Sequence, residues 1–372
     1  MKVMRDLVGA EFPLFAFSHC RDVVAAVSRA GGFGVLGGSS FTPESLEHEL
    51  SWIDDHVDGK PYGIDILIPE HQPVEQGATL DELLAHIPER HLDFTVNLLR
   101  KAGIAVTRDE VVTRDLPTTM PEVGEALMDV AFRHPVRLIA NALGIAPPSM
   151  IERARLHGVP VAALVGAKEH AIRQINAGID VLVAQGGEAG GHCGEVSTLV
   201  LVPEVIKAIA PIRPVPVLAA GGIMTGSQMA ACMTMGAAGV WTGSVWLAST
   251  DAETPQAFRE KMVAASSRDT IRSTSRTGKP SRQLRSAWHR AWHGADAPAS
   301  LPMPMMAMIS VPAFRLIDKA AEAGNPQALD LMSYWVGQGV GLVDSIRSAA
   351  SIVQDFKLEF ADAVGNLMSG LE

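Results

Sequence analysis

Short apolar runs bounded by glycine or proline recur along the chain. Such runs are typical of strands that are buried on both faces of a parallel sheet. Most are followed by a segment with helical spacing of apolar residues, and several of these segments end in glycine, which a left-handed helix cap prefers. The pattern predicts eight strands, at 12–18, 32–38, 62–68, 136–141, 159–165, 179–185, 215–221 and 238–244.

The alternation of strands with helices indicates a parallel sheet with right-handed crossovers. Eight such units favour a closed (β/α)8 barrel, the TIM barrel. An open doubly wound sheet is the alternative. We therefore predict an α/β protein whose fold is a TIM barrel.

Two segments do not fit a plain barrel. The connection after the third strand is long and has helical patterns, so we predict a helical insertion at 70–133 that acts as a lid or substrate-recognition region. After the eighth strand the chain turns more polar, with a basic stretch at 276–294. The predicted domains are a barrel from 1–69 and 134–275, the insertion at 70–133, and a helical C-terminal extension at 276–372.

Composition narrows the class of protein. Hydrophobic residues make up 47% of the 372 and charged residues 19%, so the chain can bury a large core. Acidic residues outnumber basic ones by 41 to 31, which argues against a nucleic-acid partner. The stretch 214–250 carries no charge, but glycine, serine and threonine interrupt it, so we expect strand–helix–strand and no membrane segment. Three scattered cysteines predict a reducing, cytoplasmic compartment.

The loop after the sixth strand has an unusual composition. It reads AQGGEAGGHCGEVS and holds five glycines between Gln185 and Gly194. Glycine lets backbone amides approach a ligand closely. His192 is the one side chain there that exchanges protons near neutral pH. We predict that this loop lines a ligand site, where the alternative is a flexible loop with a solvent-facing histidine.

A second glycine pair follows the seventh strand. Gly221 and Gly222 precede a helix that should begin near Ser227, an arrangement that binds phosphate through amide groups and the helix dipole. The eighth strand ends in Thr242-Gly243-Ser244, and the loops after strands seven and eight commonly bind phosphate in barrels. Tight packing of small residues is the alternative interpretation.

Other motifs point away from metal and dinucleotide sites. There is no P-loop, no HExxH and no paired zinc spacing, and GFGVLG at 32–37 lacks the order of a dinucleotide fingerprint. We expect four histidines to face solvent: His86, His91, His134 and His170. The pair His289 and His293, interleaved with tryptophans, predicts a packing helix and no metal site.

The loops together resemble the nitronate monooxygenases, formerly 2-nitropropane dioxygenases. AQGGEAGGHCG, AAGGIMTG, GVWTGSVWLAS and AAVSRAGGFGVLGG carry the resemblance, which covers residues 5–275, and TGKPSRQLRSAW is similar to a further family stretch. The resemblance implies an FMN-dependent TIM barrel in which His192 is the catalytic base. The cofactor-binding residues that it implies, some by position alone, are Gln185, Gly190, Gly191, Gly221, Gly222, Thr242, Gly243, Ser244, Asp65, Ala16 and Phe17.

Two positions depart from the family pattern. Family members commonly have Ala-Pro-Met at the end of the first strand, where the corresponding stretch of this chain is Phe15-Ala16-Phe17-Ser18. The third strand usually ends in an asparagine that contacts the flavin, and Asp65 stands there instead. A carboxylate beside a flavin would disfavour the anionic reduced form, so these changes bear on the substrate more than on FMN binding.

Two activities remain open from the sequence. The first is oxidation of alkyl nitronates with O2 by an FMN oxidoreductase. The alternative is an NAD(P)H-dependent FMN reductase that acts on an enoyl (CoA or acyl-carrier) thioester or a quinone. The partners are then a small-molecule substrate with O2 or NAD(P)H, without nucleic acid or membrane, and a homodimer is one of the open oligomeric states.

Overall fold

The core of the protein is a closed barrel of eight parallel strands. A computed structural model describes residues 1–68, 79–113 and 121–371. The strands follow one another around the barrel in chain order, and β1 pairs with β8 to close it, which excludes the open sheet. The strands are β1 (Leu14–Ser18), β2 (Phe33–Gly37), β3 (Tyr62–Asp65), β4 (Ile139–Asn141), β5 (Val161–Val165), β6 (Val181–Gln185), β7 (Val217–Ala220) and β8 (Gly239–Thr242).

All eight predicted strands are present, and most are a few residues shorter than predicted. The end of β3 shows why. The apolar run continues to Ile68, but the amides of Leu67 and Ile68 bond to the side chains of Ser39 and Asn141 and so leave the ladder. Side chains therefore end the strand where the apolar pattern alone would extend it.

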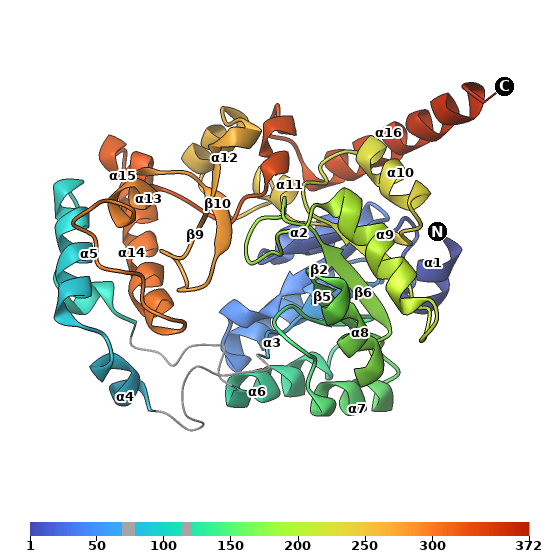
Figure 1. The fold of residues 1–372 in the computed structure, drawn as a ribbon, viewed down its shortest axis with the longest axis horizontal. Coiled ribbons are helices and arrows are strands. Elements are labelled where there is room, and N and C mark those ends of the chain that lie inside the picture. Colours follow the sequence, from blue (N-terminus) through green and yellow to red (C-terminus); the bar gives the residue numbers. More distant parts are fainter. Residues whose placement is uncertain (69–78, 114–120, 372) are drawn as a thin grey trace.

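Helices surround the barrel (Figure 1). They are α1 (Lys2–Val8), α2 (Arg21–Arg29), α3 (Pro43–His56), α6 (Pro121–Ala131), α7 (Pro148–Leu156), α8 (Lys168–Ala177), α9 (Thr198–Ile209), α10 (Gly226–Thr234) and α11 (Ser244–Leu247). Among the helices of the described ranges, none is both long and apolar enough to cross a membrane.

Alternate residues of each strand face the two sides of the barrel wall. Ile64, Ala163 and Leu182 belong to the cluster between the strands and the outer helices. Phe15, Val183 and other residues at the intervening positions form a separate cluster inside the barrel. This period of two places the side chain of Asp65, which follows Ile64, in the barrel interior.

A second lobe stands beside the barrel mouth, on the left of Figure 1. It contains α4 (Leu80–Ala85), α5 (Glu89–Lys101), α12 (Gln256–Val263), α13 (Ala287–Trp292), α14 (Met305–Glu322) and α15 (Pro326–Leu331). One hydrophobic cluster joins residues of the insertion, such as Leu99, to C-terminal residues such as Trp288 and Phe314. The second lobe is thus built from two distant parts of the chain.

The predicted insertion is not all in the second lobe. α6 packs on α3, and its residues Leu127 and Met128 belong to the barrel cluster, as expected for the barrel helix between β3 and β4. Residues 69–78 and 114–120 of the predicted insertion lie outside the described residues. The division into domains stays a prediction.

The C-terminal region also contains elements that the sequence did not predict. β9 (Thr270–Ser273) and β10 (Ser281–Leu284) form a two-stranded antiparallel sheet within the basic stretch and just before it. α16 (Ala349–Ser369) returns to the barrel, where it packs on α10 and α2, and its end projects outward (Figure 1).

Candidate active site

The carboxyl ends of the eight parallel strands meet at one end of the barrel, which we call the mouth. Beneath it the strand residues are buried, whereas Phe17, Gln185, Gly221 and Gly243 at the strand ends are half-exposed. Ligands of parallel barrels bind at this end. The structure therefore places several of the predicted site residues together around one opening.

The loop after β6 is fixed by the β9–β10 sheet. Gly191 exchanges two backbone hydrogen bonds with Arg282 of β10, at 2.9 and 2.7 Å, and the Arg282 side chain donates twice to the Gly187 carbonyl. The loop is thus bonded to β10 at Gly187 and Gly191, which argues against the interpretation as a flexible loop.

His192 is oriented by a carbonyl of the same region. Its Nδ1 lies 3.1 Å from the carbonyl oxygen of Pro280, so Nδ1 carries the proton and donates it, and Nε2 keeps its lone pair. Burial is the main cause that lowers the pKa of His192 below its ordinary value. A neutral imidazole with a bare Nε2 is the form that a general base requires.

A C-terminal segment, 335–338, lies across the glycine loop. The Gly337 amide donates to Ser244 Oγ at 2.9 Å, and the Gln338 amide donates to the Glu188 carbonyl at 2.8 Å. A Cβ on Gly190 would lie 2.9 Å from the Gly337 nitrogen and 3.0 Å from the Trp335 oxygen. Gly190 therefore has to be glycine for this packing, whatever it does toward a cofactor.

The loops after β7 and β8 present free amides. Gly221 and Gly222 have φ of 111° and 70°, a region that favours glycine. Within the described part of the chain, the amides of Gly221, Gly222 and Gly243 donate to no backbone or side-chain acceptor. A Cβ on Gly243 would meet nothing within 4 Å. Gly243 therefore borders open space, and the three amides without acceptors are the kind of donors that an anion cradle requires.

A side chain of the protein already occupies the beginning of α10, where the helix dipole was predicted to help bind a phosphate. α10 begins at Gly226, close to the expected start, but the Gly226 amide donates to the Glu359 carboxylate of α16 at 2.7 Å. Thr225 accepts from the Gln228 amide. The beginning of α10 is thus already bonded, and the glycine amides are the better phosphate ligands.

Two predicted cofactor residues face away from the mouth. Ala16 is fully buried in the cluster between the barrel and its helices. Thr242 Oγ1 donates to the Phe15 carbonyl and accepts from the Trp246 indole. Only their backbone atoms remain for a ligand, while the neighbouring Phe17 and Gly243 line the opening.

Asp65 carries a buried carboxyl at the mouth end of β3. Its Oδ1 has no hydrogen-bond partner, and burial raises its pKa to about 7. Because register pairs Asp65 with Gly37 and Ala140, the carboxyl lies at the last level of the strands, beneath the opening. Buried polar atoms are normally hydrogen-bonded, so this oxygen is expected to bond to a ligand, since no described residue of the protein bonds to it.

The sequence analysis missed His19 as a mouth residue. His19 follows β1, its Nδ1 lies 3.0 Å from the Gly37 carbonyl oxygen, and its ring stands edge-on to Phe17 with centroids 5.1 Å apart. A Cβ on Gly37 would lie 2.6 Å from this ring. The available signal was its position directly after a strand.

Other histidine predictions have mixed outcomes. His86 and His170 are exposed, as predicted. The solvent-facing prediction is wrong for His91, which bonds to the Ala299 carbonyl, and for His134, which lies between Glu47 and Asp54. Helical spacing does not reveal a surface that another segment covers.

The helix of the paired histidines is a packing helix. In α13, His289 closes the capping box with Ser286 and His293 contacts the Ser273 hydroxyl, while Trp288 and Trp292 are buried.

The two glutamates near His192 are engaged elsewhere. Glu188 accepts from the amide and hydroxyl of Thr198, and Glu195 is exposed and pairs with Arg272. Neither bonds to His192 among the described contacts, so the basicity of the imidazole depends on burial, on the Pro280 carbonyl and on the nearby charge of Lys279.

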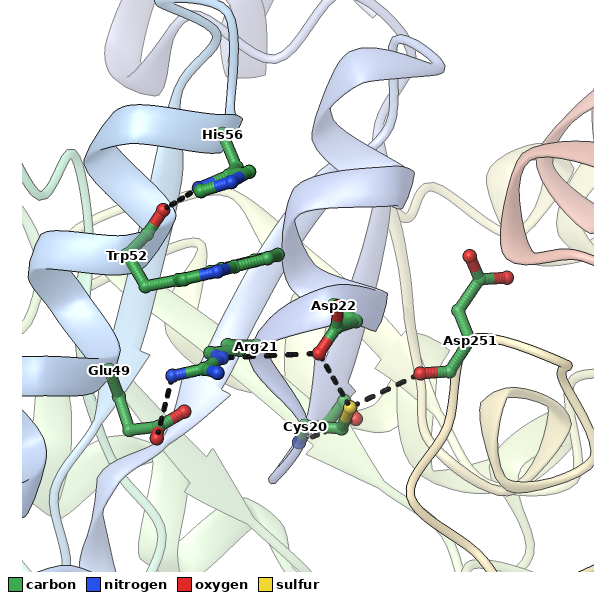
Figure 2. Close-up of polar contacts among 8 residues, drawn as sticks. Cys20, Arg21, Asp22, Glu49, Trp52, His56 and Asp251 are labelled. Atoms are coloured by element: carbon green, nitrogen blue, oxygen red, sulfur yellow. Dashed lines mark hydrogen bonds and ion pairs between the residues drawn. The ribbon is translucent and has the colours of Figure 1, made fainter.

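A polar cluster lies just outside the mouth, at the start of α2 (Figure 2). Arg21 stacks on Trp52 at 4.7 Å and pairs with Glu49, which joins α2 to α3. Ligand atoms of Cys20, Asp22 and Glu253 lie within 4.8 Å of one another, but the Cys20 thiol donates to the Asp251 carbonyl at 3.3 Å. We assign the cluster a structural role.

The fold is a (β/α)8 barrel, and the loops after β6, β7 and β8 lie together at its mouth. Residues 6–359 match the sequence profile of the family described as nitronate monooxygenase. The protein named "Putative monooxygenase Rv1533" from Mycobacterium tuberculosis is 51% identical over 368 residues, which covers 97% of each chain. A "Probable nitronate monooxygenase" of Staphylococcus saprophyticus is 28% identical and covers 93% of this chain and 94% of its own.

Two solved structures resemble the whole chain. Nitroalkane oxidase from Streptomyces ansochromogenes has a TM-score of 0.79 and 25% identity, covering 98% of this chain and 99% of its own. FabK from Thermotoga maritima has a TM-score of 0.71 and 26% identity, covering 98% of both chains. The chain belongs to the nitronate monooxygenase family, a family of flavin-dependent oxidoreductases.

Proposed function

We propose that this protein is an FMN-dependent enzyme that oxidises alkyl nitronates with O2. The main observation in support is the geometry of His192. Its Nδ1 is bonded to the Pro280 carbonyl, which leaves Nε2 unprotonated, and the residue belongs to the glycine loop that is bonded to β10 at the mouth. When bound, the flavin accepts electrons from the substrate and passes them to O2. The family membership supports this activity.

The residues around the mouth fit an FMN cofactor. The free amides of Gly221, Gly222 and Gly243 suit its phosphate, and the Ser244 hydroxyl keeps its proton for donation because its oxygen accepts from Gly337. The orphan carboxyl of Asp65 suits a polar edge of the ring system. Gln185 and Phe17 are half-exposed at the same opening.

His192 has two tasks in this proposal. With a nitroalkane in its neutral form, Nε2 removes the proton α to the nitro group and holds it as the nitronate forms. With a preformed nitronate no proton has to leave, and the imidazole only orients the substrate. The two substrates therefore separate base catalysis from orientation.

The first experiment measures oxygen uptake by flavin-loaded protein given an alkyl nitronate, with and without NAD(P)H. We expect uptake without any nicotinamide. No uptake, together with anaerobic bleaching of the flavin by NADH or NADPH, would contradict the proposal and favour the reductase that acts on an enoyl thioester or quinone.

The second experiment tests the base. We expect His192→Ala to keep its flavin and to lower kcat/KM for nitroethane by about 10²- to 10⁴-fold, with a smaller loss for ethyl nitronate. His170→Ala, an exposed histidine on α8, is the control. Equal losses on both substrates would assign His192 to orientation alone.

A further inference from the structure

Arg276 is a buried cation without an acidic partner. It is 6% exposed and lies between β9 and β10. Its guanidinium lies over three rings, at 4.1 Å from the centroid of Phe314, 4.5 Å from Trp335 and 5.2 Å from Tyr334. Arg276 forms no ion pair with any carboxylate of the described residues. Burying an uncompensated charge is costly, so the position calls for an explanation.

The hydrogen bonds of Arg276 leave one edge of the guanidinium free. Nη1 donates to the Ser333 carbonyl at 2.9 Å, Nε is buried without a partner, and Nη2 bonds to no described residue. Nε and Nη2 form the side-on edge that a carboxylate binds with two parallel hydrogen bonds.

Two more donors near this cation lack acceptors. The Trp335 indole Nε1 is buried and unpartnered, in the ring that Arg276 stacks on. His289 accepts from the Ser286 amide at Nδ1, so its Nε2 carries the proton, and this atom is also buried and unpartnered. Burial, and after it the charge of Arg276, lowers the pKa of His289 to about 3, which keeps the ring neutral. The unmet groups are donors, and an oxyanion is the complementary ligand.

Asp318 does not fill this role. It acts on Arg276 only at longer range, without an ion pair, and burial raises its pKa to about 6. The donors of Arg276, Trp335 and His289 remain unmet with Asp318 present.

The cluster adjoins the glycine loop. Ring atoms of Trp335 lie 3.9 Å from the position of a Cβ on Gly191, the residue before His192. Arg276 and Gly191 thus both adjoin the indole ring of Trp335, which places the guanidinium close to the loop that carries the proposed base.

We propose that Arg276 is a specificity-determining residue that binds a carboxylate carried by the substrate. The proposal rests on the proposed function, which identifies the nitronate as the reacting end of the substrate. The new element is a carboxylate at the other end. Trp335 contributes its indole N–H and one face of the stack around the guanidinium.

The test compares propionate 3-nitronate with propyl-1-nitronate, which replaces the carboxylate by a methyl group. We expect Arg276→Met to lower the preference for the carboxylate substrate, measured as the ratio of kcat/KM values, by about tenfold or more, mainly through KM. Arg276→Lys should lose part of this preference because ammonium has no side-on edge. Arg290→Met removes a surface charge of the same segment, paired with Asp330, and is the control.

An equal change for both substrates, or none, would overturn the proposal. If neither nitronate is oxidised by the parent enzyme, the proposed function fails, and binding is then measured directly. Thermal stabilisation by 3-nitropropionate but not by 1-nitropropane, lost in Arg276→Met and kept in Arg290→Met, would still support the carboxylate site. No difference between the two ligands would refute it. Should Arg276→Met not fold, Arg276→Lys decides by the same ratio.

Discussion

Two histidine rings at the barrel mouth are held in the same way. His19 and His192 each place Nδ1 against a backbone carbonyl oxygen, of Gly37 and Pro280 respectively. Both rings therefore keep Nε2 as an acceptor. His192 stands out in the sequence because glycines surround it, whereas the signal for His19 is only its position directly after a predicted strand.

The buried carboxyl of Asp65 gives a prediction about pH. Its folded pKa of about 7 lies above the ordinary value for aspartate of about 4. The native state therefore loses stability as pH rises from about 4 to about 7, and the loss is complete above the folded pKa and absent only below about 4. We expect flavin-free Asp65→Asn to gain about 2 kcal/mol more over the parent at pH 8 than at pH 5. Urea unfolding at the two pH values measures this difference.

The same gain at both pH values would contradict an ionising Asp65 and assign the effect to packing. Asn is the suitable replacement because it keeps the shape of the side chain and does not titrate.

At the scale of elements, the strands were predictable and their ends were not. The apolar runs reflect burial on both faces of the barrel wall, so periodicity finds them. The end of β3 depends on Ser39 and Asn141, which come from other parts of the chain. The β9–β10 sheet lies partly in a basic stretch whose polar residues hide its pairing with the glycine loop.

The contact between the glycine loop and segment 335–338 predicts the effect of a methyl group. Gly190→Ala should destabilise the protein by about 1–3 kcal/mol, because its Cβ would meet backbone atoms of Trp335 and Gly337 that cannot rotate away. Denaturant unfolding of the flavin-free protein measures this effect. A neutral result would show that segment 335–338 is not packed on the loop.

At Gly243, in contrast to Gly190, the structure leaves room for a methyl group. Its Cβ would meet no atom and its φ is −131°, so flavin-free Gly243→Ala should be closer in stability to the parent than Gly190→Ala is. The methyl group would occupy the space before the free amides, and we expect the Kd for FMN to rise about tenfold or more. Titration of the flavin-free protein with FMN measures the Kd. Unchanged affinity would remove Gly243 from the cofactor site.

At the scale of the whole molecule, the barrel could be predicted from the sequence, but the assembly of two distant segments into one second lobe could not. Helical patterns are visible in both the insertion and the C-terminal extension. Their apolar faces, however, do not reveal that Leu99 and Trp288 share one cluster. The position of Arg276 within that lobe was equally hidden, since a basic stretch is expected to face solvent.

Cofactor binding should stabilise the entire fold. A ligand that binds only the native state adds about 4 kcal/mol when it is present at a thousand times its Kd. We therefore expect flavin removal to lower the melting temperature, and added FMN to restore it. Calorimetry with and without FMN measures the shift, and an unchanged melting temperature would count against a preformed phosphate cradle.

The hydrophobic cluster of the second lobe joins segments that are synthesised at different times. α5 leaves the ribosome almost two hundred residues before α13 and α14, against which its apolar face packs. Until those helices emerge, residues such as Val96 and Leu99 have no surface to cover them, although much of the barrel is already made. Completion of the second lobe is thus a late event in folding, and the nascent chain is most exposed to aggregation while the barrel is being finished.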